Sequence, residues 1–153
     1  MKGGRDVGGH PWFYFVEYEP DIEAALQKLR RREFEAGRYN PAVDFPVFPV
    51  SERSPAPGAR HGSIEEAFEE ADADGTRSIL DMERVGDEPD FQVVAPLGRE
   101  TLLELFGTER PTREAVEESE ELFDALERGM GVYVIVYEGE RASEIFFAGY
   151  SFD

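Results

Sequence analysis

The sequence contains no cysteine, and this absence excludes several kinds of site at once. A disulfide framework, a zinc–thiolate centre and a thiol nucleophile all need cysteine side chains. Long apolar runs are missing too, because the longest, residues 132–137, is far shorter than the ~18 residues of a membrane-spanning helix. Residues 1–10 lack the apolar stretch of a secretory signal, so we expect a flexible leader there. These absences favour a cytoplasmic protein.

Recognisable catalytic patterns are also lacking. The chain has no P-loop and no G-x-G-x-x-G, G-x-S-x-G or H-E-x-x-H pattern. Its two histidines, His10 and His61, have no carboxylate or nucleophile beside them in the sequence. The sequence therefore favours a protein that is not an enzyme.

Basic residues are few, and the formal net charge is −18 at pH 7. Such a charge repels nucleic acid and anionic membranes, and it attracts a basic protein surface. A solvated surface without any partner would carry the same charge. Our leading hypothesis is a non-enzymatic acidic protein-interaction module, immunity-like or regulatory, with neither a nucleic-acid nor a membrane partner.

The periodicity of apolar residues predicts one α+β domain over residues 11–153. We expect a mainly antiparallel sheet of about five strands with about four helices packed on it. The expected strands cover residues 11–18, 77–85 and 90–97 and a hairpin-like pair over 132–152. The expected helices begin near Asp21, Ser63, Arg99 and Thr112, and the first and last of them end near Gly37 and Arg128. Aromatic residues are concentrated in the first strand and the last two, so we expect the two ends of the chain to meet centrally in the sheet.

A proline-rich loop separates the first two helices, over residues 38–62. Its prolines exclude a helix and allow at most an edge strand near residues 47–50. Long loops in small domains are often functional, and aromatic side chains here can form one wall of a groove. The second hypothesis is therefore a small-ligand-binding protein or enzyme with a pocket under this loop. The candidate contact residues are Arg38, Tyr39, Asn40, Phe45, Phe48 and His61.

The stretch EADADGTRSILD, residues 70–81, approaches the spacing of an EF-hand calcium loop. Alignment on Gly75 places Glu70, Asp72 and Asp74 at the first three ligand positions and Asp81 at the last. An arginine occupies the usually apolar eighth position, and the last ligand is shorter than the usual glutamate. The alternative interpretation is a helix end with Gly75 in a left-handed conformation. Weak calcium binding is thus the third hypothesis, and calcium is the only cofactor that the sequence suggests.

The segments REFEAGRYNP, SIEEA, ADADGTRSILDM and EIFFAGYSFD resemble a family of small uncharacterised bacterial proteins. The resemblance spans most of the chain after residue 10. It implies a bacterial, intracellular protein of a single domain. No activity is assigned to that family, so the resemblance implies no catalytic or binding residue.

Overall fold

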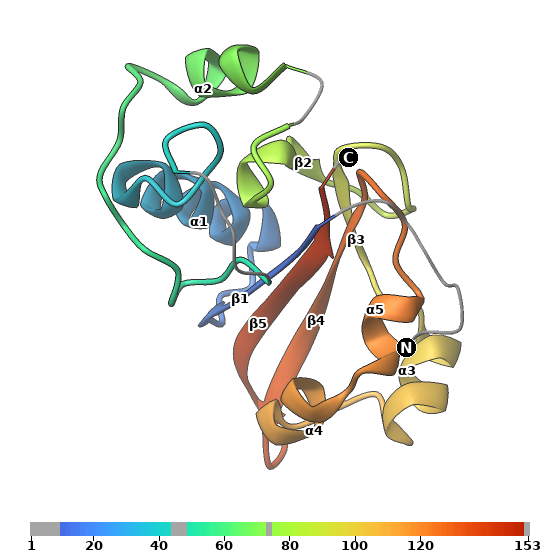
Figure 1. The fold of residues 1–153 in the computed structure, drawn as a ribbon. Coiled ribbons are helices and arrows are strands. Elements are labelled where there is room, and N and C mark those ends of the chain that lie inside the picture. Colours follow the sequence, from blue (N-terminus) through green and yellow to red (C-terminus); the bar gives the residue numbers. More distant parts are fainter. Residues whose placement is uncertain (1–9, 44–48, 73–74, 152–153) are drawn as a thin grey trace.

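A five-stranded sheet organises the fold, and its strand order is β1-β5-β4-β3-β2 (Figure 1). The computed structural model describes residues 10–43, 49–72 and 75–151. The strands are β1 (Pro11–Glu17), β2 (Arg84–Val85), β3 (Val93–Pro96), β4 (Gly131–Glu138) and β5 (Arg141–Tyr150). The helices are α1 (Ile22–Ala36), α2 (Ile64–Ala71), α3 (Arg99–Phe106), α4 (Arg113–Glu118) and α5 (Glu121–Asp124), with a 3₁₀ turn, η2 (Ile79–Asp81). The predicted α+β class is confirmed.

The antiparallel part of the sheet is the larger part. β5 pairs antiparallel with β1 on one side and with β4 on the other, along most of its length. The parallel pairings of β4 with β3 and of β3 with β2 are short. The predicted pairing between the first strand and the last is therefore confirmed. Of these two strands, β5 lies inside the sheet and β1 is an outer strand, so the predicted central position is wrong for β1.

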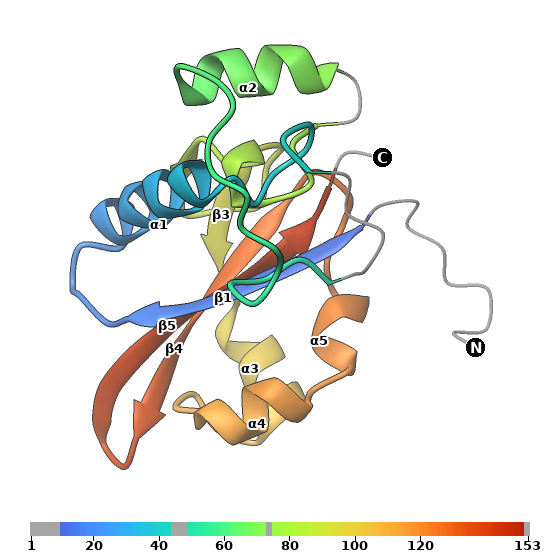
Figure 2. The ribbon, with the colours of Figure 1, turned by 60° about the vertical axis from the view of Figure 1, so that its left-hand side comes forward.

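Helices cover both faces of this sheet (Figure 2). Trp12 and Tyr14 of β1 are fully buried on the face covered by α1 and η2. Phe13 and Phe15 alternate with them and pack on the other face with residues of α4 and α5. Both faces of β1 are therefore apolar because each faces a hydrophobic core, as the bulky residues at successive positions of the sequence predict.

The predicted helix boundaries hold where capping residues define them. The side chain of Asp21 accepts a hydrogen bond from Ala24 N and begins α1, and Gly37 ends this helix with a φ of 78°. Ser63 caps α2 in the same way, by accepting from Glu66 N. Local sequence is sufficient for these boundaries because a cap bonds within one helical turn. No helix within the described ranges is long and apolar enough to cross a membrane.

The predicted strand over residues 77–85 is wrong for most of its length. Its centre is the 3₁₀ turn η2, and only Arg84–Val85 joins the sheet. The fully buried carboxylate of Asp81 accepts hydrogen bonds from the backbone N (2.6 Å) and hydroxyl (2.7 Å) of Thr76. These bonds curl the segment back on itself, so it cannot extend as a strand until residue 84.

The predicted helix over residues 112–128 is interrupted at Ser119, where the backbone becomes extended (φ −82°, ψ 104°). α4 and α5 are the two short helices on either side of this break. In one continuous helix Val116 and Leu122 would point about 120° apart, because they are six residues apart at about 100° per residue. The break lets both side chains become buried in the same core.

The predicted leader lies outside the described residues except at its last position. His10 N donates to the Ser151 hydroxyl (2.9 Å), and Ser151 N donates to His10 O (2.9 Å). The chain is thus tied to its other end as soon as β1 begins.

Candidate functional site

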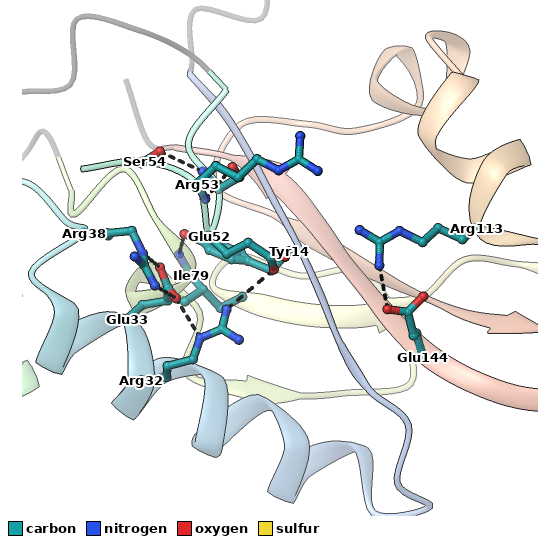
Figure 3. A network of polar contacts seen from close by, with 11 residues as sticks. Tyr14, Arg32, Glu33, Arg38, Glu52, Arg53, Ser54, Ile79, Arg113 and Glu144 are labelled. Atoms are coloured by element: carbon teal, nitrogen blue, oxygen red, sulfur yellow. Dashed lines mark hydrogen bonds and ion pairs between the residues drawn. The ribbon is translucent and has the colours of Figure 1, made fainter. Parts of the chain in front are cut away.

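Arg38, the first residue of the proline-rich loop, belongs to a buried ion network (Figure 3). Its Nε and Nη2 donate to the two carboxylate oxygens of Glu33 at 2.7 and 3.0 Å, and Arg32 Nε donates to the same carboxylate at 2.8 Å. Glu33 is fully buried in the last turns of α1. The hydrogen bond to Glu33 raises the pKa of Arg38. Burial, and then the charge of Glu33, raises the pKa of the Tyr14 hydroxyl well above its usual value.

Tyr39 and His61 join the two ends of the loop. The Tyr39 side chain is fully buried, and its hydroxyl accepts from Arg60 N (3.2 Å) and lies 2.8 Å from His61 Nδ1. The second nitrogen of His61, Nε2, lies 2.7 Å from Glu70 Oε1. Because a carboxylate only accepts, Nε2 of His61 is the donor to Glu70. The structure thus supplies the carboxylate and hydroxyl that the sequence around His61 lacks, but the buried hydroxyl serves to hold the loop.

Asn40 ties the same loop to the segment before η2. Its backbone N donates to Thr76 O (2.8 Å), and its side-chain Nδ2 donates to Gly75 O (3.0 Å). Phe45 and Phe48 lie outside the described residues. In the described loop, the predicted contact residues therefore make internal bonds, and their role towards a ligand stays a prediction.

The acidic residues proposed as calcium ligands are used separately. Glu70 contacts His61, while the carboxylate of Asp81 is turned into the interior. Asp72 is exposed at the end of α2, and Asp74 lies outside the described residues. Gly75 has the predicted left-handed φ of 71°, but α2 ends at Ala71 with Asp72 as its cap, so the predicted helix end at Gly75 is wrong. In the described part of the chain no three His, Asp or Glu side chains could hold a metal ion, so calcium binding stays a prediction without geometric support.

A pocket of about 340 Å³ opens between the sheet, α4, α5 and the loop, and we call it the aromatic pocket. Four phenylalanines from β1, β5 and α5 contribute to its lining: Phe13, Phe15, Phe123 and Phe146. The other lining residues come from the loop and from α4 and its end: Ser51, Glu52, Arg53, Arg113, Val116, Glu117 and Ser119. Within the described loop, Ser51, Glu52 and Arg53 line this pocket, and the described candidates Arg38, Tyr39, Asn40 and His61 do not.

The loop reaches this pocket because it bonds to the free side of β1. Val50 N donates to Pro11 O (3.0 Å), and Phe13 N donates to Val50 O (2.9 Å). These two bonds form a single parallel bridge between Trp12 and Val50, within the predicted edge segment 47–50. The outer side of an edge strand has backbone N–H and C=O groups that no strand of the sheet pairs with. Here Val50 of the loop bonds to two of these groups, Pro11 O and Phe13 N.

A tight turn follows this bridge, and Figure 3 shows its residues Glu52, Arg53 and Ser54. Ser51, Glu52 and Arg53 of this turn form one wall of the aromatic pocket. Ser51 N donates to the Ser54 hydroxyl (3.0 Å), and Arg53 N donates to the Ser51 hydroxyl (3.1 Å). Glu52 Oε1 lies 3.8 Å from Arg32 Nη2, which connects the wall to the buried ion network on α1. The wall is therefore fixed by bonds at both ends of the turn.

Two arginines face the aromatic pocket, and their charges are balanced differently. The Arg113 guanidinium lies 4.1 Å from the centre of the Phe15 ring and pairs with Glu117 (2.9 Å) and Glu144 (2.7 Å). Its hydrogen bond to Glu117 raises the pKa of Arg113. Arg53 is exposed and forms no ion pair with any residue that the structure describes. Among the described lining residues, Arg53 is therefore the charge that remains available to a ligand.

Comparisons with protein-family models, with curated proteins and with solved structures found no match for this chain. The resemblance to a family of small bacterial proteins stays a prediction. In the sequence, the aromatic residues of β1 and β5 indicated only that these strands meet, and the aromatic pocket was not predicted. Aromatic residues on both faces of an outer strand, followed by a long loop, are the pattern that could have indicated it.

Proposed function

We propose that the aromatic pocket binds a small molecule with a flat apolar body and one anionic group. The observation that carries this proposal is the set of four phenylalanine side chains lining an open pocket beside the available charge of Arg53. A flat body that covers these rings removes apolar surface from water on both partners. A carboxylate or sulfonate matches the planar donor groups of a guanidinium.

The size of the pocket sets the expected ligand and its affinity. At about 340 Å³ it lies near the lower end of small-molecule sites, which suits a bicyclic aromatic compound. 1-Naphthoate has about thirteen non-hydrogen atoms, and at about 0.3 kcal/mol each they give about 4 kcal/mol. The corresponding dissociation constant is about 1 mM. This compound is therefore a probe of the site and not a candidate for its natural ligand.

The test is a titration of the full chain with 1-naphthoate and, separately, with neutral 1-naphthalenemethanol. The melting temperature, Tm, is measured at each concentration. A tenfold excess over the dissociation constant stabilises the native state by about 1.4 kcal/mol. For a chain of this size that raises Tm by about 3–6 °C. We expect a larger rise in Tm with naphthoate than with the neutral compound. In Arg53→Gln, the rise in Tm with naphthoate should fall to that seen with the neutral compound.

A pocket-filling variant shows whether binding occurs at this place. Ser119 lines the aromatic pocket, so Ser119→Phe should abolish the effect of both compounds. Ala125→Phe is the matched control, because Ala125 is exposed at the end of α5 and lines no part of the pocket. Absence of any Tm rise at ~10 mM probe, an excess of about tenfold over the expected constant, would contradict the proposal. Equal effects of the probes on Ser119→Phe and on wild type would contradict it as well.

A further inference from the structure

A second depression lies between α1, α2 and η2, and it encloses about 540 Å³. We call it the acidic groove. Its apolar floor consists of Ile64, Phe68 and Leu80. Its rim carries the carboxylates of Glu65, Glu69 and Glu83, and Arg30 of α1 completes the lining. The groove therefore combines an apolar strip with charge of predominantly one sign.

The sequence of α2 explains this combination. Ala67 and Ala71 are buried against the body, so these small residues let the helix lie close to it. Residues four apart lie on the same side of a helix, one turn from each other. Ile64 and Phe68 therefore form one row along α2, and Glu65 and Glu69 form the adjacent row. Ile64 and Phe68 are half-buried, so part of this apolar row lines the groove.

The three rim carboxylates outnumber the one described cation of the lining, Arg30, whose pKa the charges of Glu65 and Glu83 act to raise. Glu65, Glu69 and Glu83 are exposed, and none of them forms an ion pair with a described residue. Arg30 donates to Gln27 Oε1 (2.9 Å) and to Leu80 O (3.3 Å). Burial lowers the pKa of Arg30, which reflects its withdrawal from water. The potential at the open side of the groove is therefore negative.

We propose that the acidic groove docks a basic amphipathic segment of a partner protein. A large apolar side chain of this segment lies on the floor beside Ile64 and Phe68, and its lysines or arginines pair with Glu65 and Glu69. Helices that dock in grooves use apolar anchor residues that are three or four positions apart. A net charge of −18 disfavours a second copy of this chain as the occupant and increases the rate at which a basic partner associates.

This inference does not depend on the aromatic pocket. α1 and α2 lie on one side of the sheet, and α4 and α5 lie on the other (Figure 2). The described lining residues of the two depressions do not overlap. Binding at the acidic groove and binding at the aromatic pocket can therefore succeed or fail separately.

The experiment uses isothermal titration of the full chain with a synthetic amphipathic helix built from leucine and lysine. The peptide is unlabelled, because an aromatic label could itself enter the aromatic pocket. A leucine–glutamate peptide of the same length and a lysine–serine peptide serve as comparisons. We expect binding by the leucine–lysine peptide, weaker binding by the lysine–serine peptide and none by the leucine–glutamate peptide. Binding should weaken at higher salt, because the pairs at the rim are exposed.

Matched charge variants locate the binding site. Glu65→Gln with Glu69→Gln removes two rim charges, and Glu118→Gln with Glu121→Gln removes two exposed charges from α4 and α5. The two double variants have the same net charge. We expect about a fivefold loss of affinity for the first and less than about twofold for the second, since exposed ion pairs contribute little each.

Phe68→Ala tests the apolar floor, with circular dichroism as the check that the chain remains folded. We expect this substitution to lower the affinity for the leucine–lysine peptide and to leave the affinity for the lysine–serine peptide unchanged. Equal losses for the two charge variants would mean that the peptide senses only overall charge, and this result would overturn the proposal. Absence of binding by the leucine–lysine peptide at low salt would overturn it too.

Discussion

The packing of Trp12 against two glycines leads to a sharp prediction about stability. Gly149 on β5 lies between Trp12 on β1 and Gly131 on β4 in the register of the sheet. A Cβ atom at Gly149 would lie 2.5 Å from Trp12 Cζ2 and 2.5 Å from the backbone oxygen of Met130. The backbone at Gly149 is ordinary, so the close approach of the indole is what requires glycine here.

The magnitude follows from what surrounds the added methyl group. Carbon atoms normally contact at about 3.5–4.0 Å, so the alanine side chain of Gly149→Ala would overlap its neighbours by about 1 Å. Trp12 is fully buried, and the other neighbour is backbone, so neither can move at low cost. Overpacking of a core typically costs about 1–3 kcal/mol, and we expect about 3 kcal/mol here. This corresponds to a decrease in Tm of about 6–12 °C.

The assay is urea unfolding followed by intrinsic fluorescence, because Trp12 is the single tryptophan of the chain and is buried. Gly98→Ala is the control, since a Cβ there meets no atom within 4 Å and its backbone is also ordinary. Trp12→Leu should reduce the cost of Gly149→Ala, and a double-mutant cycle measures this coupling. Because Trp12→Leu removes the single tryptophan, all four variants of the cycle are followed by circular dichroism. If Gly149→Ala unfolds at the same urea concentration as Gly98→Ala, the close packing of the indole on β5 is wrong.

Three further predictions concern buried polar groups. Arg38→Ala should lower the free energy of unfolding by about 3 kcal/mol in urea titration, because it leaves the buried Glu33 carboxylate without its bidentate partner. Replacing Glu33 and Arg38 together by methionine should cost less than Arg38→Ala, and a larger loss would contradict this account. Burial raises the pKa of Tyr14 from its ordinary value of 10.0, so its contribution to stability is complete below about pH 10 and is lost as pH rises above it. Tm measured from pH 8 to 11 should therefore decrease less steeply in Tyr14→Phe than in wild type, and parallel curves would contradict the assignment. Asp81→Ala should lower the free energy of unfolding by about 2–3 kcal/mol, because both hydrogen bonds from Thr76 are lost. The decrease should be the same with and without calcium. A decrease in stability that is seen only with calcium present would instead favour the metal hypothesis.

The features that were predicted correctly from the sequence depend on interactions between residues that are close together in the chain. Asp21 and Gly37 determine the ends of α1 because a cap bonds to residues within the same turn. The apolar run that begins after Met130 and the turn at Gly139 predict the hairpin of β4 and β5. Composition alone excludes disulfide and thiolate sites, because cysteine is absent.

The tertiary structure decided the features that depend on distant residues. The local pattern of residues 77–83 is compatible with a strand, but the bond between Asp81 and Thr76 bends this segment. The pattern after Thr112 is compatible with one continuous helix, but Val116 and Leu122 are both buried in the same core, which requires a break between them. Glu33 has the sequence context of a solvated helix residue, yet Arg38 allows it to be fully buried.

The aromatic pocket is another example of this dependence on distant residues. Its lining joins β1, the loop after Val50, α4, α5 and β5, which no local pattern brings together. The sequence determined that both faces of β1 are apolar and that residues 38–62 form a loop. Only the pairing of Val50 with β1 and the break at Ser119 decided that part of this apolar surface remains open to a ligand.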